Sequence, residues 1–380
     1  MKITIFFFLF LLLYAFQTNA CLNYYYSLDK DGHLYELGET WKFPFNKNFN
    51  LELNVSKLKN LEKKLKEEKN YMLLSDYAVC LMKIGKAKEA LTILAELYKH
   101  YPNEYQIASN LGTAYELNGK NDSALKYIKR GLQLNPHDHE DSEWIHIKIL
   151  EAKQKLKTDP SYLDKQSVLQ LSEKQKKDSA IRNQLDIQLK ERVPFTPGPD
   201  AIIVSLFNDL GDLSANLRSI EYARAYYQIA KDYYGGKKGL FDPKIKEMTL
   251  LIGKYKNVQP QKDNKRESSN IKIHGINYKD ILIDNTHDYK INWNEINVNT
   301  TELLAMADLS QTLEEVKQIA DKDTCELKLI KEHDNFIKSK PITKEWESSE
   351  QEEKNNLLFY IGGAVIFILT FLFYKLKRKK

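Results

Sequence analysis

The sequence predicts a mainly α protein: a solenoid of paired helices, a small α+β unit after it, and a single transmembrane helix at the C-terminal end. Three observations support this. Two adjacent segments share one pattern with a period of 34 residues. Charged residues make up 29% of the chain, while Gly and Pro number only 15 and 10, which favours a helical, soluble body. An uncharged run near the C-terminus has the length of a bilayer-spanning helix.

The repeated pattern occupies residues 71–104 and 105–138. The equivalent pairs are Ala78 with Gly112, Gly85 with Gly119, Ala90 with Ala124 and Pro102 with Pro136. Small residues let two helices approach closely, a glycine relieves strain at the turn, and a proline ends a helix. One helix pair cannot bury its own apolar face, so the pairs are expected to stack.

These positions resemble the tetratricopeptide repeat (TPR). Leu111-Gly112, Tyr115, Ala124 and Pro136 match that family's pattern well, while the first unit departs from it with Tyr77-Ala78 and Leu81. A third unit starts near Val204 and lacks the closing proline. It places Phe207, Leu210-Gly211, Ala223, Tyr227 and Ala230 on the family's positions.

The resemblance implies a concave groove, lined by the first helix of each unit, that binds a protein or peptide partner. The groove candidates are Ser75, Val79, Met82, Gln106, Ser109, Thr113 and Glu116. The alternative is that these side chains only contact neighbouring helices.

Both ends of the chain indicate export and anchoring. Lys2, the apolar run 5–16 and the small residues before Cys21 are typical of a cleaved secretory signal; an uncleaved anchor is the alternative. Cys21 is also a candidate lipid acceptor. Residues 357–374 carry no charge and precede KLKRKK, and such basic flanks stay cytoplasmic. We therefore expect a single-pass protein of a bacterial inner (plasma) membrane, with a periplasmic body and a cytoplasmic tail.

The domain boundaries follow from these patterns. We expect a signal peptide at 1–20, an aromatic-rich segment at 21–56, two repeats with a packing helix at 57–157, an amphipathic helix and Pro-rich loop at 158–200, the third unit at 201–257, a linker at 258–270, the small α+β unit at 271–345, a juxtamembrane segment at 346–356, the transmembrane helix at 357–374 and the basic tail at 375–380.

Local patterns add finer expectations. The aromatic segment is expected to pack on the first repeat, with a ligand-stacking surface as the alternative. Residues 167–192 are expected to form one amphipathic helix, and Asp200 to cap the next one. In the α+β unit, residues 278–283 and 291–298 are expected to be strands and 301–320 a helix.

Motifs for catalysis, cofactors and phosphate binding are absent from the sequence. The best candidate for chemistry is the run 137–141 with Glu143 and His146. On a helix, His139 and Glu143 would share a face and could bind zinc. We favour the alternative, a polar turn before a helix, and expect neither a metal nor a cofactor. Of the three cysteines, we expect Cys80 to be a small buried helix residue.

These observations favour a non-catalytic, membrane-anchored scaffold or adaptor. The net charge of +5 is matched by the five cations of the tail, so nothing in the exported part calls for nucleic acid. One alternative is a sensor or assembly subunit whose membrane helix pairs through residues 362–364. The other is an enzyme with its site in residues 271–345.

Overall fold

The computed structural model describes residues 26–36, 45–255, 276, 278–284 and 289–311. The described residues up to Ser310 form one compact unit. The predicted signal peptide, Cys21, the linker 258–270, the transmembrane helix 357–374 and the basic tail all lie outside the described residues, as does most of 271–345. Within the part that is described, no helix combines the length and the apolar character needed to cross a membrane.

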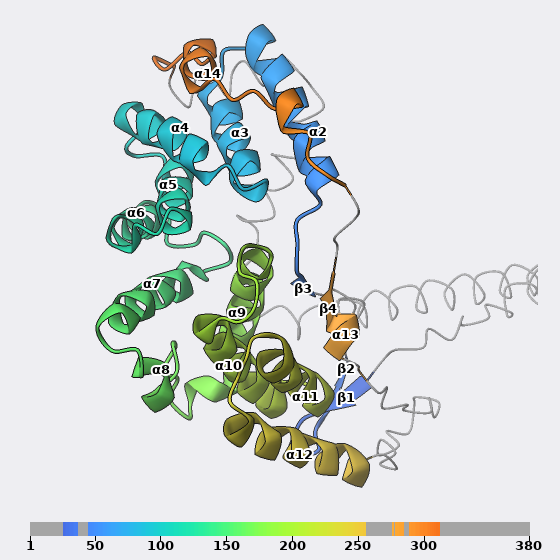
Figure 1. The fold of residues 1–380 in the computed structure, drawn as a ribbon. Helices are drawn as coiled ribbons and strands as arrows, with labels where there is room; N and C mark the ends of the chain where they lie inside the picture. Colours follow the sequence, from blue (N-terminus) through green and yellow to red (C-terminus); the bar gives the residue numbers. More distant parts are fainter. Residues whose placement is uncertain (1–25, 37–44, 256–275, 277, 285–288, 312–380) are drawn as a thin grey trace, which may run out of the picture. The chain divides into compact units, whose positions relative to one another are not determined.

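The described residues form a mainly α array of helices, which confirms the predicted class (Figure 1). The array consists of α2 (Leu51–Glu67), α3 (Tyr71–Lys83), α4 (Ala87–His100), α5 (Tyr105–Leu117), α6 (Asn121–Leu134), α7 (Glu143–Thr158), α8 (Tyr162–Lys165), α9 (Ser179–Arg192), α10 (Ala201–Leu217), α11 (Ile220–Gln228) and α12 (Lys238–Tyr255). Most of these helices contact the next one along the chain.

Short elements accompany the array. They are the antiparallel strands β1 (Tyr26–Leu28) and β2 (Leu34–Glu36), the parallel strands β3 (Phe45–Asn46) and β4 (Leu282–Ile283), the helices α13 (Tyr278–Ile281) and α14 (Thr300–Met306), the 3-10 turns η2 (Gln175–Lys177), η3 (Val193–Phe195) and η5 (Trp293–Glu295), and the π-helical turn η4 (Ile229–Tyr233).

The first two predicted repeats are the helix pairs α3/α4 and α5/α6. The Asn70 side chain caps α3 by accepting a hydrogen bond from the Met72 amide at 2.8 Å. The turn inside each pair places Gly85 at φ +90° and Gly119 at φ +74°, a left-handed conformation that glycine adopts at little cost. The 34-residue pattern therefore predicted both the helices and their turns.

Small residues bring the helices of each pair together. Ala78, Ala90 and Ala124 are completely buried. A Cβ on Gly112 would lie 2.6 Å from Ile128 Cδ1 and 3.0 Å from the Ile128 backbone nitrogen of α6. The helix backbones are thus too close here for a side chain, as the sequence pattern predicted.

The third predicted unit is the pair α10/α11. Asp200 caps α10, since its Oδ1 accepts a hydrogen bond from the Ile203 amide at 2.8 Å. Gly211 packs against Tyr227, whose Cε1 would be 2.3 Å from an added Cβ. The pair therefore repeats the close approach of α5/α6.

Residues 158–200 are less regular than expected. Of residues 167–192, which were expected to form one helix, 179–192 form the helix α9, whereas 167–174 have no helical structure. The reason is local: Asp178 Oδ1 accepts a hydrogen bond from the Ala180 amide at 2.9 Å and caps the helix. Upstream, Gln170 has φ +50°, which a continuous α-helix does not allow.

The described residues of the aromatic N-terminal segment pack mainly on the third pair, which differs from the expected position on the first repeat. Phe45 is 1% exposed, and its ring lies edge-on to Phe207 and Tyr226, with centroids at 5.2 and 6.0 Å. Ser27 Oγ donates a hydrogen bond to Ser219 Oγ at 2.6 Å. At the end of this segment, α2 packs on α3 of the first repeat, and Lys83 Nζ of α3 lies 5.7 Å from the centroid of the Phe49 ring.

The described part of 271–345 lies on the helical array. Residues 278–283 were expected to be a strand, but 278–281 form α13 and only Leu282 and Ile283 join β3. Adjacent residues Ile281 and Leu282 are both buried, at 6% exposure each, whereas a strand would point them to opposite faces. Of residues 291–298, only 293–295 form a regular element, the turn η5.

Further along, this C-terminal segment reaches the first repeat. Lys59 Nζ on α2 lies 2.9 Å from Glu295 Oε2, and α14 contacts both α2 and α4. Leu303 of α14 is 4% exposed, and the Tyr101 hydroxyl donates a hydrogen bond to the Asp308 carbonyl at 3.2 Å. The segment thus covers the side of the array formed by α2 and α4.

Replacing Gly112 with Ala should lower the free energy of unfolding by about 1–3 kcal/mol, because the new methyl group overpacks the contact with α6. Gly253→Ala is the matched control, since nothing lies within 4 Å of a Cβ at this position of α12. It should be neutral or stabilise by up to about 1 kcal/mol through helix propensity. Urea unfolding followed by circular dichroism measures both, and equal shifts would contradict the proposed close approach.

Candidate functional site

The predicted groove residues lie on α3 and α5 and differ in exposure. Gln106 is exposed, Val79 and Thr113 are half-buried, Ser75, Met82 and Ser109 are buried, and the Glu116 side chain is 7% exposed. The exposed and half-buried positions are the ones that a partner could touch. The groove itself stays a prediction.

Two of the buried groove candidates contact neighbouring helices. Asn110 Nδ2 on α5 donates a hydrogen bond to Ser75 Oγ on α3 at 3.3 Å. A Cβ on Gly131 of α6 would lie 2.2 Å from Ser109 Oγ. For Ser75 and Ser109 the structure therefore shows the packing contacts that formed the alternative interpretation.

The Glu116 carboxylate joins three helices. Its Oε2 accepts a hydrogen bond from His146 Nε2 of α7 at 2.7 Å. Its Oε1 accepts from Lys153 Nζ of α7 at 2.7 Å and from Arg192 Nη1 of α9 at 3.0 Å. The chain's own α7 and α9 therefore occupy the groove position of Glu116.

A second buried acid extends this network. Glu143 is 2% exposed; its Oε2 lies 3.5 Å from His146 Nδ1 and its Oε1 2.5 Å from His139 Nδ1. On the other side of the His139 ring, Nε2 lies 3.9 Å from Glu191 Oε1 of α9. Acidic and imidazole side chains thus alternate from Glu116 to Glu191, and we call these five residues the ionic junction.

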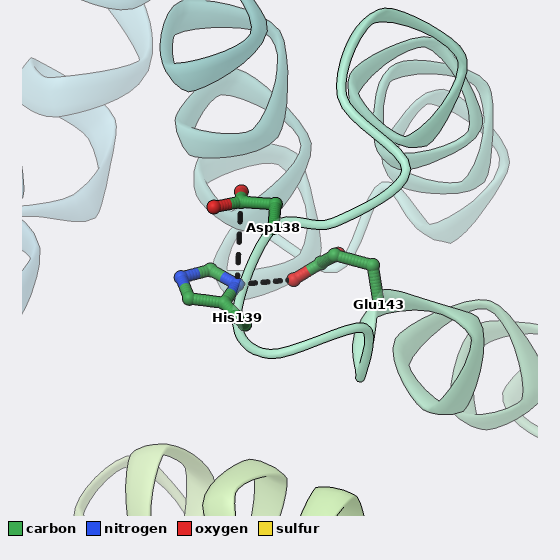
Figure 2. A group of neighbouring side chains, drawn as sticks. All are labelled: Asp138, His139 and Glu143. Atoms are coloured by element: carbon green, nitrogen blue, oxygen red, sulfur yellow. Dashed lines mark hydrogen bonds and ion pairs between the residues drawn. The ribbon is translucent and has the colours of Figure 1, made fainter. Parts of the chain in front are cut away.

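An unusual turn positions His139 (Figure 2). His139, Glu140 and Asp141 have φ of 48°, 54° and 63°, although residues with a Cβ rarely adopt the left-handed region. The zinc interpretation of the sequence placed His139 and Glu143 on one helix face, whereas the favoured alternative was a polar turn before the helix. In the structure, His139 precedes α7, and the turn brings its ring to Glu143 and to within 3.8 Å of Asp138 Oδ2.

The ionic junction shifts the protonation of its members. The hydrogen bond to Glu143 raises the pKa of His139 to about 9. Burial alone would raise the pKa of Glu143, but the hydrogen bond from His139 and the adjacent His146 lower it below its usual value. Burial acts in the same way on Glu116, whose pKa the charges of Arg192 and His146 hold well below its usual range. Both acids are therefore ionised at neutral pH.

A separate buried acid lies on α10. Burial, together with the neighbouring Asp212, raises the pKa of Asp209 to about 7. Asp212 accepts hydrogen bonds from the Tyr227 hydroxyl, at 2.7 Å, and from Lys244 Nζ. These contacts tie α10 to α11 and α12, so this cluster serves the packing of the third pair.

Sequence reasoning found part of the ionic junction. It singled out His139, Glu143 and His146 from their spacing. It missed the contacts of Glu116 with Lys153 and Arg192, because only the fold brings these side chains together. The charge of Glu116 on a groove position was the one available signal.

The two stacked helix pairs with left-handed glycine turns make the N-terminal part of the described chain a TPR-like helical repeat. Residues 60–158, from α2 to the end of α7, match the coatomer epsilon subunit family. The match covers about a quarter of the chain, and it contains both N-terminal repeats, Glu116 and His146. No curated protein matches the chain significantly.

Replacing Glu116 with Gln should lower the free energy of unfolding by about 3 kcal/mol, because Lys153, Arg192 and His146 lose the carboxylate that they share, and the side chains of Arg192 and His146 are largely buried. Glu151→Gln is the matched control on α7: its carboxylate is 38% exposed and pairs with Lys129 and Lys148. Such surface pairs contribute less than about 1 kcal/mol. Thermal unfolding measures the stability of both variants. A small effect of Glu116→Gln would show that the three side chains bound to Glu116 find other partners.

Proposed function

We propose that the chain is a non-catalytic interaction protein that binds a protein partner through its first two repeats and works as part of an assembly. The observation that carries this proposal is the family match. The family is named for a subunit of coatomer, a protein assembly, and the matched residues 60–158 contain the helices that present the groove candidates.

The contacts within the chain narrow the binding surface. Because α7 and α9 already engage Glu116, the partner binds on α3 and on the part of α5 that precedes Glu116. There Gln106 is exposed, and Val79 and Thr113 are half-buried. Their mixed apolar and polar character suits an extended or helical peptide, which TPR grooves commonly hold.

A photo-crosslinking amino acid at position 106 of the full-length membrane protein tests this proposal. It should give a discrete adduct that mass spectrometry identifies as a protein partner. The same probe at position 250 is the control, since Leu250 on α12 is 65% exposed and remote in sequence from the first two repeats.

Specificity is tested by Thr113→Arg in the protein that carries the probe at 106. A bulky cation on the neighbouring groove position should reduce the adduct at least about tenfold, which corresponds to 1.4 kcal/mol of binding free energy. The proposal fails if the probe at 106 gives no adduct, or the same adduct as the probe at 250 with no effect of Thr113→Arg.

We further propose that the body lies outside the cytoplasm and is held at the plasma membrane by one C-terminal helix. The apolar run 5–16, the uncharged run 357–374 and the cationic tail support this topology independently of each other. In sealed, right-side-out vesicles, added protease should digest the body and leave an epitope after Lys380 intact. Digestion of the epitope with an intact body would reverse the proposed topology.

A further inference from the structure

We propose that Asp138, His139 and Glu143 form a binding site for one divalent zinc ion. These residues offer two carboxylate oxygens and one imidazole nitrogen, which all lie within 4.8 Å of one another (Figure 2). Two elements contribute: the left-handed turn after Pro136 carries Asp138 and His139, and the first residue of α7 is Glu143. The inference is independent of the proposed partner binding.

The distances are close to those of a zinc site. With metal–ligand bonds of about 2.0–2.2 Å in a tetrahedron, two ligand atoms are roughly 3.3–3.6 Å apart. His139 Nδ1 lies 3.8 Å from Asp138 Oδ2 and 2.5 Å from Glu143 Oε1. Zinc displaces the Nδ1 proton of His139 to solvent, and a shift of the ring by about 1 Å lets metal bonds to Nδ1 and Glu143 Oε1 replace the hydrogen bond between them.

The surroundings allow both this movement and entry of the ion. The His139 side chain is 39% exposed, and that of Asp138 is 15% exposed. Glu143, at 2% exposure, forms the fixed floor of the site. Water can therefore reach the ring side of the site and complete the coordination as the fourth ligand.

Two neighbouring side chains, Glu191 and His146, orient the ligands His139 and Glu143. Ligating imidazoles commonly direct their second nitrogen to a carboxylate, and Glu191 Oε1 lies 3.9 Å from His139 Nε2. Glu143 Oε2 is buried and receives no hydrogen bond from the described residues; His146 Nδ1 lies 3.5 Å from it. A buried carboxylate oxygen without a donor indicates a further partner, such as water or a bound ion.

The ligand types favour zinc over the hard cations. Imidazole suits zinc and other transition metals, while Ca²⁺ and Mg²⁺ prefer oxygen ligands alone. Three protein ligands and a water form a common zinc arrangement. Bound zinc would fix the strained turn to α7 and, through Glu191, strengthen its contact with α9.

Isothermal titration of full-length protein in detergent with ZnCl₂, in excess Mg²⁺, tests the site. We expect one zinc ion per chain. His139→Ala and Asp138→Asn should each weaken zinc binding at least about tenfold. Removing a side chain that only hydrogen-bonds a metal ligand already has an effect of this size. His137→Ala is the matched control, because His137 is 78% exposed and pairs with Asp141 instead.

Circular dichroism of each variant separates loss of the site from loss of the fold. Asp138 and His139 are both partly exposed, so their two variants test the site independently. X-ray absorption of the zinc-loaded protein should show nitrogen and oxygen ligands and no sulfur. Binding of zinc with equal affinity by the wild type, His139→Ala and Asp138→Asn would overturn the proposal. So would the absence of one-to-one binding, or a loss confined to His137→Ala.

Discussion

A single buried carboxylate holds the middle of this molecule together. Glu116 lies in the last turn of α5, the first helix of the second repeat. It accepts hydrogen bonds from His146 and Lys153 of α7 and from Arg192 of α9. Burying one ion costs free energy that only well-placed opposite charges offset. The need to satisfy Glu116 therefore helps to set the positions of α7 and α9, and α10 packs in turn on α9.

The ionic junction also changes what the repeats can offer to a partner. In a solenoid of identical units, the inner face continues from one first helix to the next. Here the charged position of that face, Glu116, contacts α7 and α9 of the same chain. The irregular residues 158–178 replace a regular repeat. The structure consequently separates two N-terminal repeats from the third pair, which has its own polar cluster around Asp212.

The sequence predicted features whose cause is local. Gly85 and Gly119 mark turns because the backbone there is left-handed, and Asp200 marks a helix start because its side chain caps the next turn. Features that depend on distant residues were not predictable. Arg192 meets Glu116 across 76 residues. The polar turn before α7 was expected, but its three consecutive left-handed residues, from His139 to Asp141, were not, because residues with a Cβ rarely adopt that conformation in succession.

The two flanking segments have a consequence for how the protein is made. The N-terminal strand β3 pairs with β4 and packs on the third pair. The helix α14 packs on α2 and α4. During synthesis, the first repeats leave the ribosome long before the segment that covers them. Folding that depends on such distant pairings is slow and leaves apolar surface open to aggregation. A shortened chain that stops after α12 would keep that surface open permanently.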